Sequence, residues 1–312
     1  ELPRALAGLP VHEGVLDAGL DYIEARRDCA DFIAHAYIRL LRTPRLAAGV
    51  APRLLGRAKA VLLGFKYWPG EPGIDSLCTW TENHQILYAS AAFILGRAWP
   101  DEVFTNSGMR GRELAASALP RIRRWLGLRF RTGFSEWLSN VYYDEDLTAL
   151  LGLVDFAAAG AVGDAAPGGA APEDADHGRA AAPAGSLDDP GQEVAARAGA
   201  VADLLILDLA LHSCRGVFGP SHGRSYEAQK KDARLEAMSD TMKLAFGFGR
   251  WARNDNMSSV ALALGSYRLP PAIAAIASAD ALTGAAEIRS RMGIRIDEAE
   301  RWGLGFRDTE DG

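Results

Sequence analysis

The sequence predicts an all-α protein, and three observations support this fold class. Apolar residues recur with helical spacing along most of the chain, and convincing alternating strand patterns are absent. Segments rich in aromatic, polar, glycine and proline residues separate the helical stretches. The hydrophobic fraction of 48% and the charged fraction of 24% are ordinary for a globular domain. We therefore expect a single helical domain.

The apolar spacing also predicts where the helices lie. An opening helical region covers residues 16–40 with a break near 26–28, and further helices are expected at 50–65, 82–97, 110–126, 144–159 and 193–214. Pro120 should bend the helix at 110–126, because proline removes a backbone hydrogen bond. Ser239 and Asp240 indicate a helix stop and a new N-cap, and shorter helices are expected from Met257 and Pro271.

Residues 157–192 differ in composition from the rest of the chain. They are mostly Ala, Gly, Pro and Asp, and Val162 and Leu187 are their only large aliphatic residues. Such a segment cannot bury enough apolar area to offset the chain entropy lost on folding. We therefore expect one domain over residues 1–312, with a flexible surface insertion at 157–192. The last residues show no closing element, so we also expect a part of a longer protein.

Charge and hydropathy exclude two classes of partner. The formal net charge is -6 at pH 7, whereas a nucleic-acid-binding domain normally carries a basic stripe. No apolar run approaches the ~20 residues that a membrane-spanning helix needs. The longest stretch, residues 201–211, is broken by Asp203 and Asp208. We therefore expect a soluble protein with no nucleic acid and no membrane among its partners.

Polar and aromatic residues gather in joints between the helices, at residues 66–81, 129–143, 216–226 and 250–256. If the helices alternate in direction, the first three joints lie at one end of the array, and the fourth joins them if a helix break precedes it. Antiparallel helix pairs with one functional rim describe an (α/α) toroid or an open helical-hairpin array. We expect that fold, in complete or incomplete form. An apolar face near the C-terminus would then be exposed or covered by a partner or a missing C-terminal portion.

The first joint leads into the helix at 82–97 with Trp80, Glu82, Asn83 and His84. The positive end of the helix dipole favours Glu82 as a carboxylate and disfavours a charged His84. Glu82 alone is explained by helix capping, but an amide and an imidazole beside Trp80 favour a functional role. We expect catalytic roles for Glu82 and His84, and substrate contacts from Trp80 and Asn83.

The second joint presents Glu136, Trp137, Asn140, Tyr143 and Asp144. Each aromatic residue could be a core residue, and Asp144 could simply cap the helix that it precedes. The cluster as a whole is typical of a sugar-binding cleft, where aromatic faces contact C–H groups and carboxylates and amides contact hydroxyls. We expect Glu136 and Tyr143 to be catalytic, and Trp137, Asn140 and Asp144 to bind substrate.

The third joint is rich in glycine and presents His222, Arg224 and Tyr226. His222 and Tyr226 are four residues apart, so they would share one face if a helix begins near Ser221. Arg224 supplies a fixed fork of donors suited to a carboxylate. Ordinary loop packing is the alternative. We expect His222 and Tyr226 to be catalytic and Arg224 to bind substrate.

Familiar metal and cofactor motifs are absent from the sequence. Cys29, Cys78 and Cys214 have no CxxC spacing, so they predict neither a disulfide framework nor a zinc site by themselves. A metal site drawn from the joints lacks HExxH or EF-hand spacing; its members would be Glu82, His84, Asp144, Asp146 and His222. A complete phosphate loop and a Gly-x-Ser-x-Gly elbow are also missing. We therefore expect no metal and no cofactor.

The start of the helix at 82–97 resembles a motif of known enzymes. Residues 82–85 (Glu-Asn-His-Gln) precede an apolar run that ends in Phe-Ile-Leu-Gly at 93–96. This pattern is similar to the Asn-Asn-His helix of toroidal polysaccharide lyases of the alginate-lyase and heparinase types, although Glu82 stands where those enzymes commonly carry an amide. The resemblance implies an incomplete (α/α) toroid that cleaves a uronic-acid-containing polysaccharide by β-elimination.

The resemblance also implies roles for individual residues. Asn83 and His84 would neutralise the uronate carboxylate, and Tyr143 or Tyr226 would be the base. His222 and Arg224 would help to hold the uronate. The partner would then be a polysaccharide or oligosaccharide, and the protein would be extracellular.

Two other functions remain open from the sequence. A toroidal glycoside hydrolase uses one carboxylic acid and one carboxylate spaced to admit a water, and Glu82, Glu136 and Asp144 could supply such a pair. A non-enzymatic carbohydrate-binding or scaffolding protein would use the aromatic residues and leave the titratable groups without a chemical role.

Overall fold

The computed structural model describes residues 1–158, 189–252 and 256–279. It confirms the all-α fold class, because the strands of the described residues form only two short antiparallel hairpins. Val103–Phe104 (β1) pairs with Met109–Arg110 (β2), and Ser213–Cys214 (β3) pairs with Val217–Phe218 (β4). Within the same described ranges, no helix is both long and apolar enough to span a bilayer.

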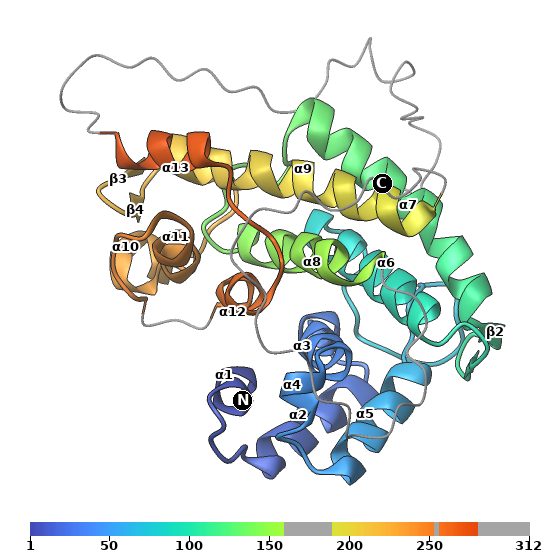
Figure 1. The fold of residues 1–312 in the computed structure, drawn as a ribbon. Helices are drawn as coiled ribbons and strands as arrows, with labels where there is room; N and C mark the ends of the chain where they lie inside the picture. The colour runs from blue at the N-terminus through green and yellow to red at the C-terminus, as the bar shows by residue number, and fades with distance from the viewer. Residues whose placement is uncertain (159–188, 253–255, 280–312) are drawn as a thin grey trace.

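The N-terminal helices lie together at the bottom of Figure 1. They are Leu2–Leu6 (α1), Glu13–Glu24 (α2), Ala30–Arg42 (α3), Pro44–Ala47 (α4) and Pro52–Leu63 (α5). The predicted break near residues 26–28 is confirmed, since α2 ends before it and α3 begins after it. Arg26 and Cys29 adopt positive φ there, which turns the chain sharply between the two helices.

The central helices are the longest of the described chain. They are Glu82–Ala98 (α6), Gly111–Thr132 (α7), Tyr143–Phe156 (α8) and Pro190–Leu211 (α9). Almost every residue of α6 and α8 is buried, because both helices are apolar on most sides. Pro120 lies inside α7, and the helix continues past it to Thr132, several residues beyond the predicted end. The predicted insertion at 157–192 falls mostly on residues 159–188, which lie outside the described residues, and α9 begins already at Pro190.

The C-terminal helices are shorter. They are Glu227–Lys231 (α10), the 3-10 turn Ala233–Leu235 (η1), Ser239–Phe246 (α11), Met257–Leu264 (α12) and Pro271–Ser278 (α13). The predicted starts at Ser239, Met257 and Pro271 are confirmed. The apolar face expected near the C-terminus concerns residues beyond 279, outside the described ranges.

The helices pack in two rows. In the first row α3 packs against α6, α6 against α8, and α8 against α12. In the second row α7 packs against α9, and α9 against α13. The α6–α7 and α8–α9 contacts join the rows, and Figure 1 shows α9 and α13 above α8 and α12.

The N-terminal ends of the first row meet at one place. Asp31, near the start of α3, lies 2.7 Å from His84 in the first turn of α6. The segment just before α8 contacts Glu82, the first residue of α6, through a 2.7 Å bond from the Ser135 amide. Asp144 at the start of α8 accepts a 2.9 Å bond from the amide of Met257, the first residue of α12. The joints therefore gather at one end of the array, as the alternation of helices predicted.

Candidate functional site

The side chain of Glu82 connects the first joint to the second through an ion pair and hydrogen bonds. Its side chain is only 2% exposed and forms an ion pair with Arg129 of α7. The same carboxylate oxygen accepts bonds from the Ser135 amide at 2.7 Å and the Ser135 hydroxyl at 2.5 Å. Through these bonds Glu82 holds the end of α7 and the segment before α8 against the start of α6.

Glu136 is the point at which three joints meet. The side-chain amide of Asn83 donates to both of its carboxylate oxygens at 2.8 Å. Arg224 from the third joint forms an ion pair with the same carboxylate, and its guanidinium lies 3.6 Å from the centre of the Tyr142 ring. Asn83, Glu136 and Arg224 were predicted site residues from segments far apart in the chain, and the structure brings them into direct contact.

A third buried carboxyl, Asp146, completes this group. Glu82, Glu136 and Asp146 each place a carboxylate oxygen within 4.8 Å of the others. Neither oxygen of Asp146 has a hydrogen-bond partner among the described residues. Burial raises the pKa of Asp146 well above its usual value, and the charge of Glu136 raises it further. Two guanidinium groups therefore balance two glutamates, and burial favours the neutral form of the Asp146 carboxyl.

Tyr143 and Asp144, at the start of α8, lie in the core. Tyr143 is 0% exposed, donates to Asp208 at 3.1 Å, and accepts from the Leu138 amide at 3.1 Å. Burial raises the pKa of its phenol. Asp144 accepts from the Met257 and Ser258 amides and so caps α12, while burial raises its pKa to about 6. The structure therefore places both side chains in the core, and a catalytic Tyr143 and a substrate-binding Asp144 stay predictions.

His84 lies beside the carboxyl network but has its own partner. Its Nδ1 is 2.7 Å from Oδ2 of Asp31, and its ring stacks on Phe32 with centroids 5.0 Å apart. Burial raises the pKa of Asp31, while the hydrogen bond from His84 lowers it. The buried imidazole is thus fixed in orientation by a carboxylate on one edge and an aromatic ring on one face.

The third joint opens into a cavity of about 420 Å³. Its lining residues are Asn140, Val217, Phe218, Gly219, Pro220, Ser221, His222, Gln229, Lys230 and Glu236. Asn140 and His222 were predicted site residues, whereas Glu236 and Lys230 were not. This cavity therefore brings an imidazole, an amide, an ammonium group and a carboxyl to one surface.

The cavity fixes the protonation of its two titratable groups. His222 Nδ1 donates to the Leu138 carbonyl at 2.5 Å, so Nε2 is the nitrogen that can accept a proton. Burial lowers the pKa of His222, which keeps the imidazole neutral near pH 7. Burial raises the pKa of Glu236 to about 7, outweighing the opposite effects of the Met238 amide and the Asn140 side chain. The cavity thus offers a neutral base beside a carboxyl that is about half protonated at neutral pH.

A smaller cavity of about 100 Å³ lies between the start of α6 and the end of α7. Its lining is aromatic and basic, with Tyr67, Trp68, Thr79, Gln85, Tyr88, Arg121, Arg124, Trp125, Leu128 and Arg129. The Arg121 guanidinium lies 4.6 Å from the centre of the Trp68 ring. Such a surface is suited to the anionic and apolar faces of a charged sugar.

The predicted residues do not form one pocket. Trp80 is 68% exposed, and Tyr226 is 51% exposed and hydrogen-bonded to Tyr142. Trp137 is half-buried, and its carbonyl accepts a 2.9 Å bond from the Gly223 amide. Neither the His222 cavity nor the smaller cavity is lined by Trp80, Trp137 or Tyr226.

Several residues of this region gave no signal in the sequence. Asp31 and Arg129 are ordinary helix residues until the fold places them against His84 and Glu82. Glu236 follows a short turn without any recognisable motif. Only the concentration of polar residues in the adjacent joints pointed toward them.

No protein-family model, curated protein or solved structure matches this chain. Its function is therefore inferred from the geometry of the site.

Proposed function

We propose that this chain is a polysaccharide lyase that cleaves a uronic-acid-containing polysaccharide by β-elimination in the His222 cavity. The observation that supports this most strongly is the pairing of a neutral imidazole with the carboxyl of Glu236 across the lining of one cavity. Asn140 and Lys230 add an amide and a positive charge to the same lining.

β-Elimination on a uronate needs two groups that this cavity supplies. A base removes the proton on C5, and the electron pair forms the C4–C5 double bond while the C4–O4 bond breaks. His222 Nε2 takes the C5 proton, and the leaving oxygen receives a proton from the imidazolium or from water. The C5 proton is acidic enough only if the neighbouring carboxylate is neutralised. Protonated Glu236, Asn140 and Lys230 serve that purpose.

The hydrolase alternative is less well supported. A glycosidase needs two carboxyl groups facing a substrate across a space that admits the sugar or a water. Glu82 and Glu136 have side chains only 2% and 7% exposed, and each is engaged by an arginine. Asp144 caps α12. These carboxyl groups therefore have a structural role, and we assign the proposed reaction to the His222 cavity.

The helix packing supports the finer fold proposal, an open (α/α) array of the toroid type. The first-row helices present their N-terminal ends to one rim, and the second row packs outside α6 and α8. The His222 cavity and the basic, aromatic cavity both lie among the joints of that rim. An anionic polysaccharide substrate would place the protein outside the cell.

The proposal is tested by incubating the protein with a panel of uronic polysaccharides and following the absorbance of an unsaturated uronate. We expect His222→Ala to lower the rate by about 10²–10⁴-fold, the usual contribution of a general base. His212→Ala is the matched control, because His212 also bonds a backbone carbonyl but does not line the cavity. Absence of unsaturated product from the whole panel, or full activity of His222→Ala, would contradict the proposal.

The pH profile separates the role of Glu236 from that of His222. Loss of the Glu236 proton above pH about 7 places a negative charge beside the uronate, so the wild-type rate should fall there. Glu236→Gln keeps a hydrogen-bond donor that does not titrate, so activity should extend to higher pH. An unchanged alkaline limit in Glu236→Gln would exclude this carboxyl from the mechanism.

A further inference from the structure

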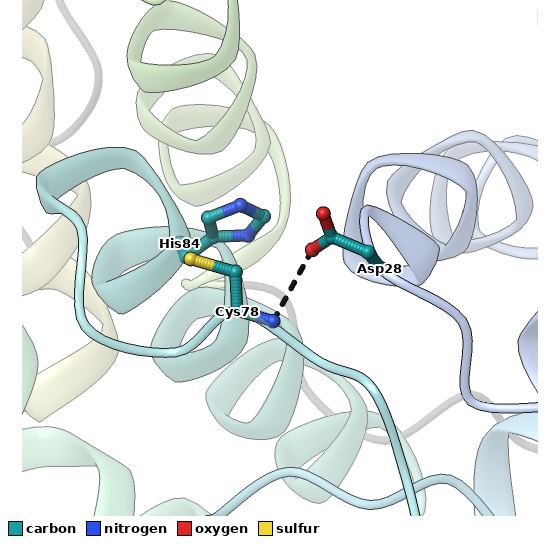
Figure 2. Close-up of side chains that lie close together, drawn as sticks. All are labelled: Asp28, Cys78 and His84. Carbon is teal, nitrogen blue, oxygen red and sulfur yellow. Dashed lines mark hydrogen bonds between the residues drawn. The ribbon is translucent and has the colours of Figure 1, made fainter.

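Three side chains with metal-binding chemistry converge away from the His222 cavity. Asp28 lies between α2 and α3, Cys78 lies in the loop before α6, and His84 lies in the first turn of α6. One donor atom from each lies within 4.8 Å of the other two. Figure 2 shows the imidazole, the sulfur and the carboxylate grouped in the space between these segments.

Each of the three side chains is held in place by a contact that leaves a donor atom available. Oδ1 of Asp28 accepts bonds from the Cys29 amide at 3.1 Å and the Cys78 amide at 3.2 Å, the second of which is drawn in Figure 2. Oδ2 of Asp28 remains for another partner. The Asp28 carboxylate thereby ties the loop that carries Cys78 to the start of α3.

The second contact orients His84. When Asp31 is ionised its carboxylate can only accept, so the 2.7 Å bond then places a proton on Nδ1 of His84 and leaves the lone pair on Nε2. Phe32 stacks on the ring and restricts its rotation. Metal-bound histidines usually have this arrangement, in which a carboxylate behind the ring fixes the tautomer and makes the imidazole a better ligand.

We propose that Asp28, Cys78 and His84 bind a zinc-type transition metal ion, with Asp31 as the positioning residue behind His84. Sulfur and imidazole nitrogen favour zinc over magnesium and calcium, which prefer oxygen ligands. Tetrahedral zinc with bonds of about 2.0–2.3 Å sets its donor atoms roughly 3.3–3.8 Å apart. Half-buried Cys78 and exposed Asp28 can close the remaining gap by rotating about their side-chain bonds.

Charge favours a metal site over a thiol nucleophile. A Cys–His pair could also activate the sulfur for attack, with Asp31 in the third position. However, a thiolate at Cys78 would lie next to the carboxylate of Asp28, and two anions at this separation repel each other unless a cation binds between them. The ion would leave one coordination position for water or a further ligand, and the proposal is independent of the lyase assignment.

The experiment is a titration of the reduced, chelator-treated full chain with Co²⁺, followed by competition with Zn²⁺. We expect one cobalt per chain, a thiolate-to-cobalt charge-transfer band and tetrahedral d–d bands, all displaced by zinc. Cys78→Ser should lose the charge-transfer band. Asp31→Asn should keep the band but weaken metal affinity by about 10–100-fold, as expected for a partner behind a ligand.

Cys214→Ser is the matched control, because Cys214 is a free and exposed cysteine on β3. Its metal titration should equal that of the wild type. Circular dichroism of every variant checks that the protein remains folded. If Asp31→Asn unfolds, Cys78→Ser still tests the site, because Cys78 is only half-buried. The proposal is overturned if the wild type shows no charge-transfer band, or if Cys78→Ser retains it. Rapid alkylation of Cys78 that depends on His84, without cobalt binding, would assign the nucleophile instead.

Discussion

Among single residues, Asp146 has the most unusual environment in the joint region. Its carboxyl is fully buried without a hydrogen-bond partner among the described residues, and burial raises its pKa well above the usual value. A protonated carboxyl and a carboxamide have nearly the same shape and no charge. We therefore expect Asp146→Asn to change the free energy of unfolding by no more than about 1 kcal/mol.

Arg129→Met provides the contrasting change in the same network. It leaves the buried carboxylate of Glu82 without its counter-ion, which typically costs about 3–5 kcal/mol. Adding Glu82→Gln to Arg129→Met should recover part of that loss. Urea unfolding of the variants measures these differences, and a penalty for Asp146→Asn as large as that for Arg129→Met would show that Asp146 is ionised.

The residue types in the joints were predictable from the sequence, but their roles were only partly so. Asn83, Glu136 and Arg224 were selected because polar groups crowd the joints, and they do meet. Nothing in the sequence distinguishes a carboxylate that faces solvent from one that Arg129 neutralises in the interior. Asp28, Cys78 and His84 likewise match no known sequence motif. The turn between α2 and α3 brings Asp28 close to the other two, and no fixed sequence spacing indicates this contact.

Among the elements, α6 and α7 approach each other closely. A side-chain carbon added at Gly96 of α6 would lie 2.4 Å from the Gly111 carbonyl oxygen and 2.9 Å from the Ala115 nitrogen. Both are backbone atoms that cannot move aside without shifting α7. We expect Gly96→Ala to destabilise the protein by about 1–3 kcal/mol through overpacking.

Gly127 of α7 is the matched control for this contact. It is also within a helix, and a carbon added there meets no atom within 4 Å. Gly127→Ala should therefore stabilise the protein by about 0.4–1 kcal/mol, because alanine lowers the conformational entropy of the unfolded chain. Thermal melts of both variants test the pair. Equal melting temperatures would contradict the close helix approach.

The helices themselves were the most predictable part of the molecule. Apolar spacing located α5, α6, α8 and α9 within a few residues, because each buries a continuous face. The end of α7 was predicted too early, since Arg129 at the predicted boundary gives no indication that it will be buried against Glu82. Packing of the rows depends on contacts between segments far apart in sequence, which local spacing does not specify.

At the scale of the whole molecule, buried carboxyl groups set the pH dependence of stability. Burial raises the pKa of Asp144 to about 6 and of Glu236 to about 7, and raises those of Glu145 and Asp146 more strongly. The folded state therefore holds protons that the unfolded state has already lost. The free energy of unfolding must then decrease as pH rises through these folded-state pKa values.

The interval from pH 6.5 to about 8 shows this effect most clearly. His35 and His222 have pKa values lowered from 6.5, so their opposite contribution shrinks as the imidazoles of the unfolded chain lose their protons above pH 6.5. Each carboxyl contributes at most about 1.4 kcal/mol per pH unit. Glu236→Gln should flatten the slope, whereas Glu227→Gln on the exposed surface of α10 should not. Stability that rises over this interval would contradict the assignment of buried neutral carboxyls.

The central claim is that the His222 cavity eliminates and does not hydrolyse. The most direct measurement is the mass of the oligosaccharides released from a uronic polysaccharide. Elimination creates a double bond at the new non-reducing end. The fragment that carries this end is therefore lighter, by the mass of one water, than the corresponding product of hydrolysis. We predict that every fragment with a newly made non-reducing end lacks that water in the wild type and the His212→Ala control, and that His222→Ala releases far fewer fragments in the same time. Newly made non-reducing ends that carry the added water of hydrolysis would contradict the account and return the paired carboxylates to consideration.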